Sequence, residues 1–385
     1  MVSIAAKSLP KLSGAVFGQF SRRKQLIQRH WLDTRTDQYY DVLRRIVVPE
    51  CKNIASDVPE YPERIEKLLY YTNPAFSDAW NFTTELIYRT VADESHQTEE
   101  NITKMYLIRA TMDLLFTMSA VLDDISDRSE FRKGKKGWHM ICQGGESTAL
   151  YDGTQMGLFP LYLLKQYFKN DPGYSRLLET VVMTYIKLTI GQTIDVLGQF
   201  KKSPSMAEYK RINYYKAGQF VAAGSELAVI HAGITSQDLI DKTVEIFTIA
   251  GQIIQTWDDF NDYYSSSEQN GKLSCDFMNA GTTWVSAKAM EVFTPSQAVK
   301  FMECYGSDDQ SKMKTVQELY DEIDMPKLYT EYVLENYNRC ETLIKELPHD
   351  RLREACSSYM EWLVVRETPD EDSEHKVALC LNISG

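Results

Sequence analysis

A largely apolar run, residues 105–122, ends directly in three carboxylates, Asp123, Asp124 and Asp127. The run predicts a buried helix, on which Asp123 and Asp127 lie one turn apart on the same face. Carboxylates that follow an apolar helix are costly to bury unless a cation neutralises them. A hard divalent ion such as Mg²⁺ prefers oxygen ligands of this kind. The motif therefore indicates either a metal site or a helix that ends in a solvated acidic turn.

The same spacing recurs at Asp258, Asp259 and Asp262, again after an apolar stretch, residues 246–254. The two motifs begin 258 − 123 = 135 positions apart, so they belong to separate helices. Two carboxylate clusters that face each other across a helical bundle can hold metal ions between them. The recurrence favours a metal site, with the predicted ligands Asp123, Asp124, Asp127, Asp258, Asp259 and Asp262.

Helical patterns cover most of the chain, and few segments alternate with the period of two that is typical of strands. We therefore expect an all-α fold with one helical domain over residues 33–366 and no repeat or long linker. Residues 1–32 are basic and serine-rich, which predicts a targeting presequence or a disordered basic tail, and residues 367–385 are expected to form a polar tail. The expected helices span residues 39–48 (ended by Pro49), 61–71, 76–91, 105–122, 153–169, 174–199, 206–232, 236–264, 284–293, 296–304, 313–321, 325–347 and 350–366.

Composition limits the classes of partner. The net charge of −12 argues against a nucleic-acid-binding surface, whereas an anionic substrate stays compatible because bound Mg²⁺ reverses the local field. The seven cysteines are scattered and odd in number, which favours reduced thiols in an intracellular protein, mitochondrial or cytoplasmic. No apolar run is long and charge-free enough to predict an integral membrane segment.

Basic residues near the acidic motifs indicate an anionic ligand. Arg132 and Lys133 follow the first motif, and Lys216 and Lys272 occur further along the chain. If the fold directs these side chains toward the acidic motifs, the site combines cations with Mg²⁺ around a polyanion, for which a diphosphate is the obvious candidate. A lone lysine is more often a solvated surface charge, so the meaning of these residues depends on the fold.

Two glutamines extend the polar pattern. Gln192 precedes Asp195 by three positions, and Gln255 shares one helical face with the second acidic motif. Polar groups on an apolar helix normally need partners. Gln192 and Gln255 are candidates for diphosphate binding, and a satisfied buried hydrogen bond is the competing interpretation of Gln192.

These motifs resemble, in order and spacing, those of farnesyl diphosphate synthases. The resemblance covers about residues 39–366 and implies an isoprenoid synthase fold, a helical bundle with a central active-site cavity. It also implies three Mg²⁺ ions that bind and ionise an allylic prenyl diphosphate, and a homodimer. The matching segments are Asp123-Asp-Ile-Ser-Asp127 with Arg132-Lys133, Gly191-Gln-Thr-Ile-Asp195, Tyr215-Lys216, Gln255 with Asp258-Asp259 and Asp262, and Gly271-Lys272 with Asp276.

The chain departs from that family where the second substrate, isopentenyl diphosphate, would bind. Ser77 and Trp80 stand in place of the family's lysine and arginine, and Gly281 replaces a later lysine. The C-terminal residues 380–385 also lack the family's basic end. A second diphosphate would meet few compensating cations, so its desolvation would be expensive. The allylic site is expected to be intact and the coupling site lost, a pattern similar to insect terpene synthases.

The cavity wall is altered as well. Phe116 replaces the family's glutamine seven residues before the first acidic pair, and Met118 and Ser119 replace two aromatics that limit the product to fifteen carbons. Phe116, Phe220 and Trp80 are candidates to stabilise a carbocation by cation–π contact, although plain core packing is the more frequent role of such residues. Phe116, Met118, Ser119 and Phe220 are the predicted cavity residues.

The sequence therefore predicts a Mg²⁺-dependent class I terpene synthase that converts a prenyl diphosphate, most simply farnesyl diphosphate, to a sesquiterpene. Two alternatives remain: a prenyltransferase that couples allylic and isopentenyl diphosphates, and a catalytically silent homologue that binds an active subunit. Both complete acidic motifs argue against the silent homologue. The predicted catalytic residues are Asp123, Asp124, Asp127, Arg132, Lys216 and Asp258, and the predicted diphosphate ligands are Arg132, Lys133, Gln192, Lys216, Gln255 and Lys272.

Overall fold

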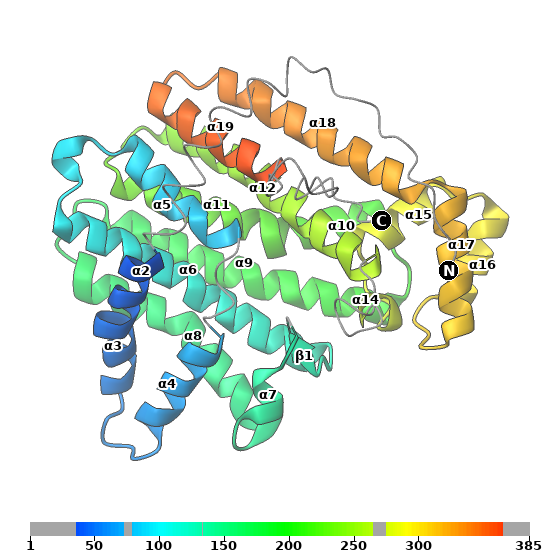
Figure 1. Cartoon of the computed structure of the whole chain (residues 1–385), viewed down its shortest axis with the longest axis horizontal. Coiled ribbons are helices and arrows are strands. Elements are labelled where there is room, and N and C mark those ends of the chain that lie inside the picture. The colour runs from blue at the N-terminus through cyan, green and yellow to red at the C-terminus, as the bar shows by residue number, and fades with distance from the viewer. Residues whose placement is uncertain (1–35, 73–78, 133, 265–274, 365–385) are drawn as a thin grey trace, which may run out of the picture.

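The computed structural model describes residues 36–72, 79–132, 134–264 and 275–364, and in this part of the chain nearly all regular structure is helical (Figure 1). The elements are α2 (Thr36–Val42), η1 (Leu43–Val47), α3 (Val48–Asn53), α4 (Tyr61–Thr72), α5 (Ala79–Val91), η3 (Glu94–His96), α6 (Glu99–Ser126), β1 (Phe131–Arg132), β2 (Lys135–Lys136), α7 (Trp138–Ile141), α8 (Gly145–Phe168), α9 (Tyr174–Lys201), α10 (Met206–Asn213), η4 (Tyr214–Gly218), α11 (Gln219–His231), α12 (Gln237–Tyr264), α14 (Cys275–Met278), α15 (Trp284–Val292), α16 (Pro295–Cys304), α17 (Gln310–Glu322), α18 (Met325–Lys345) and α19 (Asp350–Val364).

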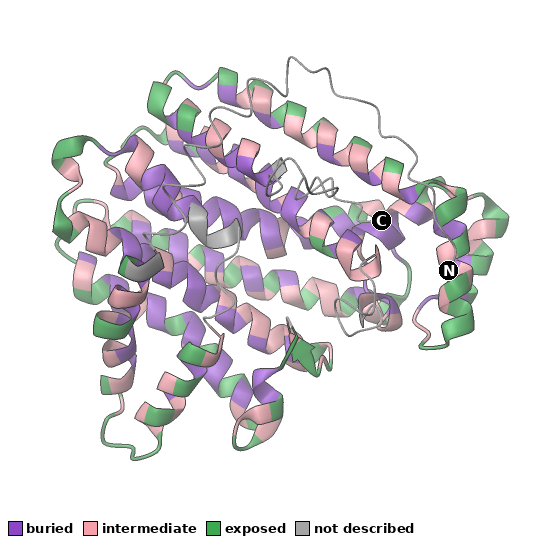
Figure 2. Cartoon of the chain, viewed as in Figure 1, coloured by how far each residue is buried: buried purple, intermediate pink, exposed green. Residues whose placement is uncertain are grey.

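Helix α11 forms the centre of the bundle. Every residue of α11 except Glu226 is buried, because α5, α6, α9 and α12 pack around it (Figure 2). A helix that is apolar on all sides is stable only when other helices cover it completely. The long helices α6 and α12 end in the two acidic motifs, and α9 carries Asp195. The core and the candidate site therefore share the same helices.

The first helical segment continues through Pro49, although the sequence predicts that Pro49 ends a helix. The preceding turn is a π-helix, η1, in which the Val48 N–H donates to the Leu43 carbonyl, and Pro49 occupies the first turn of α3. Proline is tolerated in the first turn because the N–H that it lacks has no partner within the helix there. The wider turn of η1 therefore allows α2, η1 and α3 to run as one segment, and the prediction is wrong at this residue.

A short hairpin, β1–β2, follows the first acidic motif and carries Arg132. The Tyr71 hydroxyl donates to the Lys136 carbonyl at 2.7 Å, which ties the hairpin to α4. Just beyond it, the buried Asp152 accepts two hydrogen bonds from Arg64, at 2.8 and 2.6 Å, and one from the Trp138 indole at 2.6 Å. Bidentate, charge-assisted bonds of this kind fix geometry as well as charge. The hairpin is thus tied to α4, which the Asp152 bonds in turn join to α8.

Among the described residues, one helix, α6, is long and apolar enough by composition to cross a membrane. Its apolar window is 72% buried inside the bundle, as expected for the core helix of a helical protein.

Gly251 sets the distance between α12 and η4. A Cβ atom at this position would lie 2.5 Å from the Ala217 carbonyl oxygen and 2.9 Å from the Gly218 Cα atom. We expect Gly251→Ala to lower the free energy of unfolding by about 1–3 kcal/mol, the usual cost of overpacking against backbone. Chemical denaturation monitored by circular dichroism measures the change.

Gly224→Ala in α11 is the matched control, because the added Cβ there meets its nearest neighbour, Thr84 Oγ1, at an ordinary 3.5 Å. This variant should gain about 0.5–1 kcal/mol from the better helix propensity of alanine. Equal effects of the two substitutions would contradict the close approach of α12 to η4.

Candidate active site

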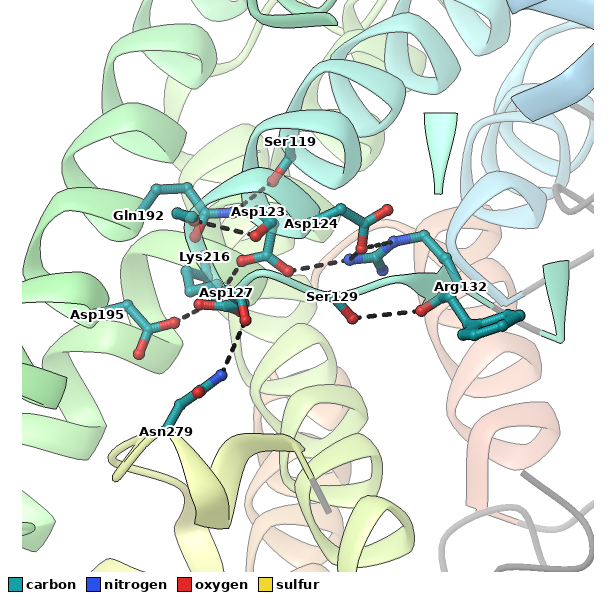
Figure 3. Close-up of polar contacts among 12 residues, drawn as sticks. Ser119, Asp123, Asp124, Asp127, Ser129, Arg132, Gln192, Asp195, Lys216 and Asn279 are labelled. Atoms are coloured by element: carbon teal, nitrogen blue, oxygen red, sulfur yellow. Dashed lines mark hydrogen bonds and ion pairs between the residues drawn. The ribbon is translucent and has the colours of Figure 1, made fainter. Parts of the chain in front are cut away.

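The C-terminal end of α6 presents the first acidic motif. Asp123 and Asp124 lie in its last turn, and Asp127 is the C-cap residue, whose N–H donates to the Asp123 carbonyl at 2.8 Å. Arg128 then adopts a left-handed conformation with φ of 54°, which turns the chain away from the helix axis. Asp124 is buried, whereas Asp123 and Asp127 are half-buried and lie on the face that looks toward α9 (Figure 3).

Arg132 reaches back from β1 to the two adjacent carboxylates. Its Nε donates to Asp124 at 2.9 Å, and its Nη2 donates to Asp123 at 3.0 Å. Burial raises the pKa of Asp124, and Arg132 offsets only part of this effect. Asp124 therefore holds the guanidinium in place from the buried side, and its predicted role as a metal ligand stays a prediction.

Lys216 meets Asp123 from the opposite side. It lies in the π-helix η4, and its Nζ donates to Asp123 at 3.3 Å and to Asp195 of α9 at 2.5 Å (Figure 3). Burial alone would raise the pKa of Asp123, but the charges of Lys216 and Arg132 outweigh it and lower that pKa below its ordinary value. Asp123 thus stays ionised between two cations that come from distant parts of the chain.

The second acidic motif lies at the end of α12, and its three carboxylates differ in environment. Asp258 is exposed and Asp262 is half-buried. Asp259 is buried and accepts hydrogen bonds from Gln255 Nε2 and from the Trp284 backbone N–H, both at 2.8 Å. Burial raises the pKa of Asp259 to about 7, and these two bonds lower it only in part. Asp259 and Gln255 therefore join α12 to the N-terminus of α15.

The two motifs influence each other electrostatically. Burial would lower the pKa of Arg132, but the charges of Asp124, Asp123 and also Asp258 of the second motif raise it instead. Asp276 of α14 joins the group, because burial and then the charges of Asp262 and Asp259 raise its pKa well above the ordinary value. The fold thus brings α6, α9, α12 and α14 to one acidic region.

Asp127 is held by two amide side chains. Gln199 of α9 donates to its carboxylate at 2.8 Å. Asn279, just after α14, donates to its carbonyl at 3.1 Å (Figure 3). Burial, followed by the charge of Asp123, raises the pKa of Asp127 to about 6. Sequence reasoning quoted Asp195 and Asp276 in motifs without assigning them a role, and it missed Gln199 and Asn279. The sequence signal for Gln199 is its i, i+4 spacing from Asp195 on one helical face, and Asn279 has no such signal.

Within the described ranges, no three aspartate, glutamate, histidine or cysteine side chains converge closely enough to form a metal site. The donor chemistry nevertheless fits a hard divalent ion, because the acidic region offers carboxylate oxygens on half-buried or exposed side chains. The raised pKa values of Asp127 and Asp276 reflect mutual repulsion among these carboxylates in addition to burial. A bound cation would relieve that repulsion.

Three of the predicted cavity residues lie on two sides of α6, and the fourth, Phe220, lies on α11. The Phe116 ring lies 6.1 Å from the Phe220 ring of α11, centroid to centroid. Met118 is buried on another side and packs so closely on Gly157 of α8 that a Cβ there would lie 2.4 Å from its sulfur atom. Ser119 is half-buried and accepts a hydrogen bond from Gln192 Nε2 at 3.0 Å (Figure 3). Phe116 and Ser119 share the face of Asp123, whereas Met118 faces α8.

Several predicted residues lie outside the described part of the chain, namely Lys133, Lys272 and Ser77. The backbone of Trp80 belongs to α5, but its side chain is not described. The roles assigned to these residues, and to Gln192 and Gln255 as diphosphate ligands, stay predictions.

The raised pKa of Asp127 makes stability depend on pH in the metal-free protein. Its pKa is 3.8 in an ordinary setting and about 6 in the fold, so ionisation above pH 6 destabilises the folded state, and this penalty disappears as the pH falls toward 4. We therefore expect Asp127→Asn to be more stable than the parent protein at pH 8, by on the order of 1 kcal/mol after allowance for solvent screening.

The difference between the two proteins should shrink to zero near pH 4, as measured by urea unfolding in the presence of a chelator. Thr193→Ala on the exposed face of α9 serves as the control, since it removes no charge. An advantage of Asp127→Asn that stays constant from pH 4 to 8 would contradict the assignment.

Comparison with known proteins assigns the chain to a family. The family model described as polyprenyl synthetase matches residues 81–323. An IDS-type sesquiterpene synthase of Nezara viridula is 39% identical over 375 residues, covering 97% of this chain and 99% of that protein, and a farnesyl pyrophosphate synthase of the same species is 26% identical over 316 residues, covering 79% and 77%. The structure of T. brucei farnesyl diphosphate synthase complexed with risedronate aligns with a TM-score of 0.77 at 21% identity, covering 86% of this chain and 98% of that one, which confirms the expected isoprenoid synthase fold. The chain belongs to the polyprenyl synthetase family.

Proposed function

We propose that this protein is a Mg²⁺-dependent class I terpene synthase that ionises a prenyl diphosphate and converts the carbocation to a sesquiterpene. The observation that carries the proposal is the placement of Arg132 and Lys216 at the acidic motifs, where both cations contact Asp123. The sesquiterpene synthase that is 39% identical over nearly the whole chain supports the same reaction and favours farnesyl diphosphate as the substrate.

Mg²⁺ is the cofactor that suits the acidic region, and the family resemblance suggests three ions. Asp123, Asp127, Asp258 and Asp262 are the carboxylates that we expect to hold them directly. Asp124 and Asp259 differ from these four because both are buried, and their hydrogen bonds to Arg132, Gln255 and the Trp284 N–H support the region from the core side. When bound, Mg²⁺ supplies charge stabilisation for the oxygens of the leaving diphosphate.

Arg132 and Lys216 bind the diphosphate, with Lys133 and Lys272 as further predicted contacts. Their acidic partners raise the pKa of both described cations, so both keep their protons at neutral pH. The bond between C1 of the prenyl chain and the diphosphate oxygen breaks, and its electron pair leaves with the diphosphate. The allylic cation that remains is surrounded by apolar side chains, among them Phe116 and Phe220, which exclude water and offer aromatic faces.

The second candidate is a prenyltransferase, which the farnesyl pyrophosphate synthases among the relatives favour. Against it stands the sequence of residues 71–80, which contains no lysine or arginine for a second diphosphate. We therefore give priority to a reaction of one prenyl diphosphate on its own.

We also propose that two copies associate through α8 and α9. These neighbouring helices expose a row of large apolar side chains, and such a face on a soluble protein marks an interaction surface. The residues concerned are Leu150, Tyr151, Leu158, Met183, Ile186, Ile190, Leu197 and Phe200.

An intracellular location, mitochondrial or cytoplasmic, is proposed from the scattered cysteines, of which Cys51, Cys142, Cys304, Cys340 and Cys356 are free thiols.

Activity assays with purified protein and Mg²⁺ separate the candidates. Farnesyl or geranyl diphosphate alone should yield a volatile hydrocarbon or alcohol, detected by gas chromatography with mass spectrometry. Longer diphosphates formed from isopentenyl plus dimethylallyl diphosphate would instead establish the prenyltransferase. No product from either mixture would leave only a binding role.

Asp258→Ala and Asp123→Ala should each lower kcat by at least about 10²-fold, the scale expected for loss of a group that stabilises developing charge. Asp309→Ala is the control, because this aspartate is an exposed N-cap of α17 far from the acidic motifs in the chain. Near-normal turnover in either motif variant would refute its role in the site.

The dimer is tested by Ile186→Asp, which places a charge in the centre of the exposed apolar row. We expect sedimentation velocity to show a dimer for the parent protein and a monomer for the variant, because burying an unpaired carboxylate is costly. Ile54→Asp is a matched control with similar exposure, 47% against 41%, outside α8 and α9. A monomeric parent protein, or a dimer that survives Ile186→Asp, would contradict this interface.

A further inference from the structure

The face of α6 that ends in Asp123 forms a continuous stripe. Met112, Phe116, Ser119 and Asp123 follow one another at intervals of four, three and four residues, so they share one side of the helix. Ser119 lies one turn from Asp123, about 6 Å along the helix axis. It is a polar side chain placed between the acidic end of the stripe and the aromatic pair Phe116 and Phe220.

Ser119 has a defined partner on α9. Gln192 Nε2 donates to its hydroxyl oxygen at 3.0 Å, across 73 positions of sequence (Figure 3). Gln192 precedes Asp195 by one turn on α9, and Asp195 holds Lys216. The same segment of α9 therefore places Asp195 next to Lys216 and Gln192 next to Ser119.

Gly191 explains how α9 comes so near to η4. A Cβ atom at this position would lie 3.0 Å from the Lys216 backbone nitrogen and from its Cγ atom. The absence of a side chain allows α9 to pack directly on the turn that carries Lys216. Gln192, the next residue, is thereby fixed close to both Lys216 and the Asp123 end of α6.

The hydrogen bond to Ser119 also orients the Gln192 amide. The NH2 group is directed to Ser119, so the amide oxygen, which lies in the same plane on the other side of the amide carbon, is directed away from Ser119 and carries partial negative charge. Gln192 and Ser119 are both half-buried, so neither is sealed into the packed core. A dipole fixed in an apolar environment stabilises nearby positive charge more strongly than the same dipole in water.

We infer that Ser119 and Gln192 form a polar subsite in the wall of the prenyl cavity that stabilises the allylic cation and thereby selects among its products. This inference rests on the proposed function. After the C1–O bond breaks and its electron pair leaves with the diphosphate, the Gln192 amide oxygen faces the cation without forming a bond to it. Ser119 is the positioning residue, because it acts through the amide that it holds.

A pair of isosteric substitutions isolates the hydroxyl group. Ser119→Thr keeps it and Ser119→Val replaces it with a methyl group, while both add the same volume. With farnesyl diphosphate and Mg²⁺, the two variants should differ in the ratio of major to minor products by about fivefold, the factor that corresponds to the net contribution of one hydrogen bond. Their KM values should agree within about twofold, because the diphosphate contacts are unchanged.

Gln192→Leu should shift the product ratio in the same direction as Ser119→Val, and the double variant should add little, because both changes remove one interaction. The controls are Thr103→Ala, at a half-buried position of α6, and Thr193→Ala, at an exposed position of α9, because each hydroxyl donates to a carbonyl of its own helix. Thermal melting verifies that each variant is folded.

Each outcome decides a separate question. Identical product ratios for Ser119→Thr and Ser119→Val, in the presence of an active parent enzyme, would overturn the subsite and leave the proposed function intact. A rise in KM for Gln192→Leu with unchanged products would overturn it as well and would assign Gln192 to the diphosphate. A parent protein that ionises no prenyl diphosphate would refute the proposed function itself, and the subsite with it.

Discussion

The carboxylate of Asp123 accepts hydrogen bonds from two cations that reach it from different parts of the fold. Arg132 approaches from the hairpin after α6, and Lys216 approaches from the π-helix before α11. A buried charge is stable only when such partners are positioned well, because the desolvation of each ion must be offset by close contacts. The hairpin anchored by Tyr71, the turn η4 and the close packing of α9 at Gly191 all maintain this arrangement.

Among the residues that the structure describes, the acidic region contains more carboxylates than cations to pair with them. Two described cations, Arg132 and Lys216, form ion pairs with Asp123, Asp124 and Asp195. The raised pKa values of Asp127, Asp259 and Asp276 mark carboxylates that burial and neighbouring charges leave poorly stabilised in their ionised form. Bound divalent cations would stabilise the ionised form of these carboxylates, and the region would then attract an anion. A metal-bound diphosphate would supply both the cations and the anion, which is the physical basis of the proposed function.

The helices and the two acidic motifs could be predicted from the sequence, because they depend on local patterns. Periodicity locates the helices that carry Asp123, Lys216 and Asp258, and the repeated aspartate spacing marks the two acidic motifs at which we propose a metal site. What sequence alone cannot give are contacts that depend on helix packing. Asn279 meets the Asp127 carbonyl across 152 positions, and Pro49 sits in a helix only because the preceding turn is a π-helix. Equally, the spacing of Asp258 and Asp259 does not reveal that Asp259 bonds to α15.

The fate of the cation follows from what surrounds it. In a coupling enzyme the allylic cation is attacked by a second substrate, whose own diphosphate must be neutralised nearby. Residues 71–80 provide no lysine or arginine for that purpose. An uncompensated diphosphate would cost several kcal/mol or more to bring out of water. The cation is therefore left with its own double bonds as the nearest nucleophiles. In the proposed reaction, the predicted cavity residues Phe116, Phe220 and Ser119 therefore have more influence on the product than the acidic motifs that release the cation.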